Sequence, residues 1–239
     1  MSTDSDDRDK AQAVTPRQWI KLVTVYFTIP MVLLFSGGDF GWWQAWLYSV
    51  LILSAGIGGR VWAERRHPGL TAERQNTEII RSAKSWDKVL APLMAVSIAY
   101  PTVLIAGLDH RYSWTAEFPP SLIAAGFTLI SSGYAFAAWA FAENRFFYSV
   151  VCVHTDRGHA VCDTGPYAVL RHPGYTGNIL GLFGVVLALG SMWALIPAAV
   201  ALVIAVTRTA LEDKTLINEL PGYSEYADRV RYRLIPGVY

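Results

Sequence analysis

Long stretches without a charged side chain constrain this sequence more than any other feature. The longest holds 35 residues without Asp, Glu, Lys or Arg and runs from Pro173 to Thr207. Four further runs of 17, 20, 20 and 25 residues lie at 22–38, 40–59, 89–108 and 118–142. A helix of about 18 or more mostly apolar residues is long enough to cross a bilayer. The sequence therefore predicts an all-α polytopic membrane protein.

The composition excludes several other classes of protein. Charged residues make up 16% of the chain, whereas an ordinary soluble domain carries roughly 25%. The net charge is +1, so no overall basic excess points to a nucleic-acid partner. The two cysteines, Cys152 and Cys162, are too few for a disulfide framework.

The longest uncharged run must fold back on itself. As one helix its 35 residues would extend roughly 52 Å, whereas the apolar core of a bilayer is about 30 Å thick. Gly190 and Ser191 lie near its middle and favour a turn. We therefore expect six transmembrane helices, arranged as three hairpins, followed by a cytoplasmic C-terminal helix.

The basic residues predict the orientation of these helices. With the N-terminus inside, 19 of the 20 Lys and Arg residues fall in inner segments, and Arg111 alone falls outside. Lys and Arg concentrate in cytoplasmic loops, so both termini are expected in the cytoplasm. The acidic, Ser-rich start predicts a disordered cytoplasmic tail over 1–17, followed by a four-span membrane region over 18–142 and a core carrying the chemistry over 143–239.

Polar residues crowd against the last two predicted spans. His172 lies 18 residues before Gly190, and Arg208 and Glu212 lie 17 and 21 residues after Ser191. A hairpin folded at this turn would place Arg171, His172 and Tyr175 beside Arg208 and Glu212, at one edge of the bilayer. Ionisable groups at that depth are costly and usually serve a functional site.

The residues alone allow two interpretations of this cluster. Arg208 and Glu212 are four apart and share a helix face, so they could form a helix-end salt bridge. They could instead bind a zwitterion, with the guanidinium holding a carboxylate and the carboxylate holding an ammonium group or a ribose diol. The segment Arg171–Tyr175 could likewise be an interfacial anchor or a binding loop.

No metal site is expected. Cys152, His154, His159 and Cys162 belong to residue types that ligate zinc, but their spacing matches no common zinc pattern. The sequence also contains no G-x-S-x-G, P-loop or G-x-G-x-x-G motif, which disfavours a hydrolase, a nucleotidase and a soluble dinucleotide-binding enzyme.

The C-terminal motifs resemble those of the isoprenylcysteine carboxyl methyltransferase family and of related membrane phospholipid methyltransferases. The resemblance covers about 145–239 and is strongest to bacterial-type members. The motifs, in order, are Gly165-Pro166-Tyr167, then Arg171-His172-Pro173-x-Tyr175-x-Gly177, then a helical hairpin, Arg208-x3-Glu212-Asp213, and a Tyr-x2-Tyr tail ending in Arg-x-Arg-x2-Pro.

The resemblance implies that S-adenosylmethionine binds in a cytosol-facing pocket and leaves as S-adenosylhomocysteine. Arg208 falls where the family places a substrate-linked arginine, and we assign the catalytic role to Arg208 and Arg171. Asp213 stands where the family has a second glutamate. Cys152 replaces a polar cofactor contact of eukaryotic members, so that contact is not carried over. The implied cofactor-binding residues are His159, Ala160, Val161, Cys162, Tyr167, His172, Pro173, Gly174, Tyr175 and Glu212.

The expected function is methyl transfer to a membrane-embedded or hydrophobic acceptor, with membrane lipids as neighbours and the bacterial inner membrane as the location. The carboxylate of an isoprenylcysteine is one candidate acceptor, and a carboxylate needs no general base. An amine or a hydroxyl would need one, for which His172 or Glu212 is available. Two alternatives remain: an NADPH-dependent membrane reductase of the sterol type, and a non-enzymatic scaffold or transport subunit.

Overall fold

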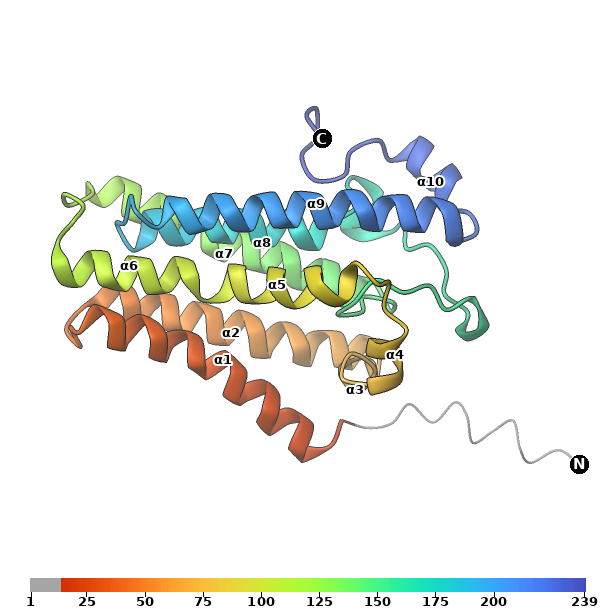
Figure 1. The fold of residues 1–239 in the computed structure, drawn as a ribbon, viewed down its shortest axis with the longest axis horizontal. Helices are drawn as coiled ribbons and strands as arrows, with labels where there is room; N and C mark the ends of the chain where they lie inside the picture. The colour runs from red at the N-terminus through yellow and green to blue at the C-terminus, as the bar shows by residue number, and fades with distance from the viewer. Residues whose placement is uncertain (1–13) are drawn as a thin grey trace, which may run out of the picture.

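The protein is a bundle of long helices, seen in a computed structural model that describes residues 14–239 (Figure 1). Most of the predicted tail over 1–17 therefore lies outside the described residues, and Pro16 already begins the first helix. The long helices are α1 Pro16–Gly37, α2 Trp43–Arg66, α5 Asp87–Ala99, α6 Pro101–Tyr112, α7 Pro120–Glu143, α8 Pro173–Ala188 and α9 Leu195–Glu219. The short ones are α3 Leu70–Glu73, α4 Thr77–Arg81 and α10 Tyr223–Arg229, with 3-10 turns η1 Thr155–Arg157 and η2 Gly165–Ala168.

The chain runs back and forth along the bundle, so that its connections gather at two ends (Figure 1). The α1–α2, α6–α7 and α8–α9 turns lie at one end. The other end, called the α10 end below, carries α3, α4, the long 144–172 segment and α10, and the C-terminal tail turns back from there over α9. The two polar stretches that the sequence singles out both lie at the α10 end.

Within residues 14–239, five helical segments are long and apolar enough to cross a membrane, namely α1, α2, α5 together with α6, α7 and α9. This confirms the prediction of a polytopic all-α membrane protein. The fifth predicted span, α8, has 16 residues and would extend about 24 Å, which is short for a bilayer core. The fold-back at Gly190 is confirmed, because this residue has a φ of +66° that glycine adopts without strain.

The third predicted span contains a break. α5 ends at Ala99 and α6 begins at Pro101. Proline lacks a backbone N–H and disfavours helical geometry at the residue before it, which explains the interruption at Tyr100. The Tyr100 hydroxyl lies 2.7 Å from the hydroxyl of Thr28 on α1, and this contact ties the break to the neighbouring helix.

α7 and α8 pack backbone against backbone. A Cβ atom added to Gly133 of α7 would lie 2.6 Å from the Gly177 carbonyl oxygen, and one added to Gly184 of α8 would lie 2.8 Å from that of Gly126. Small residues allow this close approach in membrane helices, where apolar burial alone drives little association. The contact holds the start of α8 against the end of α7 and so positions the α10 end.

We expect Gly133→Ala to lower the free energy of unfolding by about 1–3 kcal/mol, because the new methyl group would overpack the α7–α8 contact. Thermal unfolding in detergent measures this effect. Gly58→Ala is the matched control, since a Cβ atom there meets nothing within 4 Å and should be neutral or stabilising. Equal melting temperatures for the two variants would contradict the close packing.

Candidate active site at the α10 end

A cavity of about 270 Å³ opens at the α10 end, close to the size range of small-molecule sites. Its walls come from α5, the 144–172 segment, α8, α9 and α10, together with Arg74 after α3. Pro173 is the one predicted site residue that does not line it; this residue begins α8. The predicted residues that do line it are His159, Ala160, Val161, Cys162, Tyr167, Arg171, His172, Gly174, Tyr175, Arg208 and Glu212.

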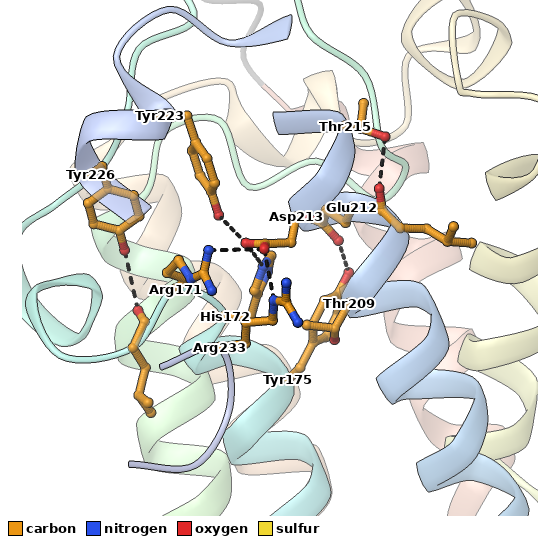
Figure 2. A network of polar contacts seen from close by, with 12 residues as sticks. Arg171, His172, Tyr175, Thr209, Glu212, Asp213, Thr215, Tyr223, Tyr226 and Arg233 are labelled. Carbon is orange, nitrogen blue, oxygen red and sulfur yellow. Dashed lines mark hydrogen bonds and ion pairs between the residues drawn. The ribbon is translucent and has the colours of Figure 1, made fainter. Parts of the chain in front are cut away.

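Asp213 is the centre of a polar network beside this cavity (Figure 2). Its carboxylate is fully buried and accepts hydrogen bonds from Arg171 Nη1 at 3.0 Å and Arg233 Nε at 2.8 Å. The Tyr223 hydroxyl donates at 3.1 Å, and His172 Nε2 lies 3.3 Å away. A buried carboxylate is stable only with such partners. The burial of Asp213 therefore explains why these four side chains lie around one point.

The same network fixes the C-terminal tail. The backbone N–H groups of Arg171 and His172 donate to the carbonyl oxygens of Tyr232 and Arg233, each at 3.0 Å. The Thr176 hydroxyl donates to the Leu234 carbonyl oxygen at 2.8 Å. The tail therefore pairs with the segment that leads into α8, and Arg233 adds its ion pair with Asp213.

Arg208 has a different carboxylate partner from the one its spacing suggested. Its Nε and Nη2 atoms donate to the two oxygens of Asp87 at 2.7 and 3.0 Å. Its Nη1 atom donates to the Tyr175 hydroxyl, which in turn donates to Glu212 Oε2 at 2.5 Å. Among the described residues Arg208 and Glu212 thus form no direct salt bridge, because Tyr175 lies between them.

Two polar groups in the cavity wall have capacity left for a ligand. Arg171 uses Nη1 and Nη2 for hydrogen bonds within the chain, but its buried Nε has no partner in the described structure. Glu212 accepts one hydrogen bond from Tyr175, whereas a carboxylate can accept about four. The cavity wall therefore offers a ligand one unused hydrogen-bond donor, on the cationic Arg171, and unused acceptor capacity on the anionic Glu212.

The 144–162 segment contributes three side chains to the cavity wall that are uncharged at neutral pH, those of Cys152, His159 and Cys162. The His159 ring stacks on Phe146, with ring centres 4.6 Å apart, and burial together with nearby His154 lowers the pKa of His159 to about 4. Burial raises the pKa of the Cys152 thiol to about 11 and also raises the pKa of Cys162. At neutral pH both thiols are protonated, which suits a cavity wall better than a metal ligand. Among the residues that the structure describes, no group of three or more His, Cys, Asp and Glu side chains is placed to hold a metal.

Sequence reasoning missed two carboxylates that organise the site. Asp87 and Asp213 are both fully buried, yet neither was predicted as a site residue. Asp87 lies two residues before the uncharged run that begins at Val89, and an acid at the edge of a span was the available signal. Asp213 was visible only as the neighbour of Glu212.

The fold and site define a multi-pass membrane protein with a cavity, lined in part by polar side chains, at one end of its bundle. Residues 121–220 match the phospholipid methyltransferase family, which confirms the resemblance to membrane methyltransferases over α7, α8, α9 and the segment between them. This match supports a membrane methyltransferase in general. Comparison with curated proteins gives no match.

We expect Asp213→Asn to destabilise the protein by about 3–5 kcal/mol, because Arg171 and His172 would lose their buried anionic partner. Thermal unfolding in detergent measures the change. Asp163→Asn is the matched control, because Asp163 forms an exposed pair with Arg229 at 3.0 Å, which is worth about 0–1 kcal/mol. A loss as small as that of the control would contradict the central role of Asp213.

His159 should contribute to acid sensitivity. Its pKa of about 4 lies below the ordinary value of 6.5, so the folded protein binds fewer protons than the unfolded chain between these values. The stability contribution of His159 is therefore present above pH 6.5 and is lost as the pH falls toward 4. His159→Phe keeps a ring against Phe146. It should make the melting temperature depend less on pH between 6.5 and 4. An unchanged pH profile would show that His159 does not titrate in this way.

Proposed function

We propose that the protein transfers a methyl group from S-adenosylmethionine to a membrane-embedded or hydrophobic acceptor, and that the cavity at the α10 end binds the methyl donor. The observation that carries this proposal is the pairing of an under-used Glu212 carboxylate with an unpartnered Arg171 Nε in one cavity, within a phospholipid methyltransferase domain.

The residues fit the functional groups of S-adenosylmethionine. Glu212 is suited to its ribose hydroxyls or its ammonium group, and Arg171 to its carboxylate. Tyr148 lines the same cavity, and an aromatic ring there favours a sulfonium cation. Leu216 near the end of α9 and Leu220 directly after it offer an apolar surface for the adenine ring.

When bound, S-adenosylmethionine supplies an electrophilic methyl group: the acceptor's lone pair bonds to the methyl carbon while the carbon–sulfur bond breaks and its electron pair stays on sulfur. The residues of the chain align the reactants and exclude water. Asp87 holds the Arg208 guanidinium in place, and Arg208 in turn holds the Tyr175 hydroxyl in the cavity wall. For an amine or a hydroxyl acceptor, His172 and Glu212 are the candidate bases that line the cavity.

The proposed function also assigns the orientation. Lys and Arg residues concentrate in the segments at the α10 end, as the positive-inside rule requires of a cytoplasmic face. A water-soluble methyl donor would then enter from the cytoplasm, and a hydrophobic acceptor would arrive from the bilayer.

Isothermal titration of S-adenosylhomocysteine into the detergent-purified protein tests the proposal. We expect binding in the wild type and a roughly 10- to 100-fold weaker affinity in Glu212→Gln, the usual loss for a charge-assisted hydrogen bond. Glu219→Gln is the control, because Glu219 lies at the end of α9 and pairs with Lys84. Absence of binding, or tighter binding of NADPH, would overturn the assignment.

A further inference from the structure

A second cavity of about 260 Å³ lies beside the first. Its walls come mainly from α1, α2 and α7, with Ile98 and Ala99 of α5 closing one side. The two cavities share the wall residues Arg74, Phe147, Gly174 and Asn178. The second cavity therefore reaches from among the membrane-spanning helices to the proposed methyl-donor site.

Two arginines mark the end of this cavity that adjoins the first. Arg60 lies on the last turns of α2, and Arg74 follows α3. Their guanidinium carbons lie 4.8 and 5.1 Å from the centre of the same Phe141 ring. The two guanidinium carbons therefore lie at most about 10 Å apart in the cavity wall.

Neither arginine has a carboxylate partner within residues 14–239. Arg74 donates through Nη1 to the Phe147 carbonyl oxygen, while its buried Nε has no partner. The pKa of Arg74 is lowered, first by burial and then by the charge of Arg60. Other arginines at this end do have such partners, since Arg66 pairs with Glu143 and Arg208 with Asp87.

An unpaired, partly desolvated cation is costly unless an anion accompanies it. Arginine is also the side chain best suited to bind a carboxylate or a phosphate through two hydrogen bonds. The pair is therefore placed to bind one anionic group, which the described part of the chain does not provide.

The rest of the cavity suits an apolar chain. Ile29, Ile52 and Ala55 line it between α1 and α2, and tyrosines 26, 48 and 134 add aromatic surface. These residues belong to helices that are apolar enough to cross a membrane. A ligand that fills this space has an anionic group at one end and a hydrocarbon portion at the other.

We propose that this second cavity binds an anionic amphiphile, with its phosphate or carboxylate group on Arg60 and Arg74 and its chain among α1, α2 and α7. On the basis of the proposed function, this amphiphile is the methyl acceptor, and the pair of Arg60 and Arg74 determines which acceptors the protein selects. Gly174 keeps the shared wall thin, because a Cβ atom there would lie 2.7 Å from the Phe147 ring.

The test measures binding of three probes with the same chain length to the protein in neutral detergent: hexadecyl phosphate, palmitate and hexadecanol. We expect at least one anionic probe to bind at least tenfold more tightly than hexadecanol. Tighter binding of hexadecyl phosphate identifies a phosphate site, and tighter binding of palmitate identifies a carboxylate site. The proposal is overturned if neither anion binds more tightly than the alcohol.

Arg60→Gln should weaken the preferred anionic probe about tenfold and leave hexadecanol unchanged. Arg65→Gln is the matched control, because Arg65 lies on the same helix and is exposed. Its substitution removes the same charge. Equal losses in both variants would overturn the assignment to Arg60. If Arg60→Gln does not stay folded in detergent, Ala55→Leu serves instead, because it narrows the cavity and retains both arginines. Undiminished binding of every probe to Ala55→Leu would overturn the assignment of the probes to this cavity.

Titration of S-adenosylhomocysteine separates this proposal from the one it rests on. Arg60 does not line the first cavity, so Arg60→Gln should bind S-adenosylhomocysteine as the wild type does. Loss of the anion preference with intact S-adenosylhomocysteine binding is the expected signature. A wild type that selects anionic probes but never binds S-adenosylhomocysteine would overturn the methyl-donor assignment alone.

Discussion

Two fully buried carboxylates organise the functional end of this protein. Asp87 and Asp213 are taken out of water, and a buried anion is stable only beside cations and hydrogen-bond donors. Asp87 meets this requirement through Arg208 and so joins the start of α5 to α9. Asp213 meets it through Arg171, His172 and Arg233 and joins the start of α8 and the C-terminal tail to the same helix. The cavity lies where these two clusters meet.

The helix packing makes this convergence possible. Glycines on α7 and α8 let the two backbones touch, which brings the start of α8 close to the end of α7 and the segment that follows it. The wall between the two cavities is shared by Arg74, Phe147, Gly174 and Asn178, and Gly174 keeps it thin beside the Phe147 ring. Small residues therefore set the distance between a water-accessible site and a space among the membrane-spanning helices.

Much of this could be predicted from the sequence, because it depends on local patterns. Uncharged runs indicated the spans, and Gly190 indicated the turn that places Arg171, His172 and Tyr175 at the depth of Arg208 and Glu212. The partners within that cluster could not be predicted. Spacing suggested a direct pair of Arg208 with Glu212, but Tyr175 lies between them and Asp87, which is 121 positions away, pairs with Arg208.

The sequence by itself determined that the chain is an all-α membrane protein and that its polar residues gather beside the last two long helices, because hydropathy and charge are properties of short segments. The tertiary structure alone decided which carboxylate compensates which arginine, since charge pairing depends on distance through space. For the same reason only the fold distinguishes Arg208, which is paired, from Arg60 and Arg74, which meet no carboxylate in the described chain and lie where a cavity can admit one.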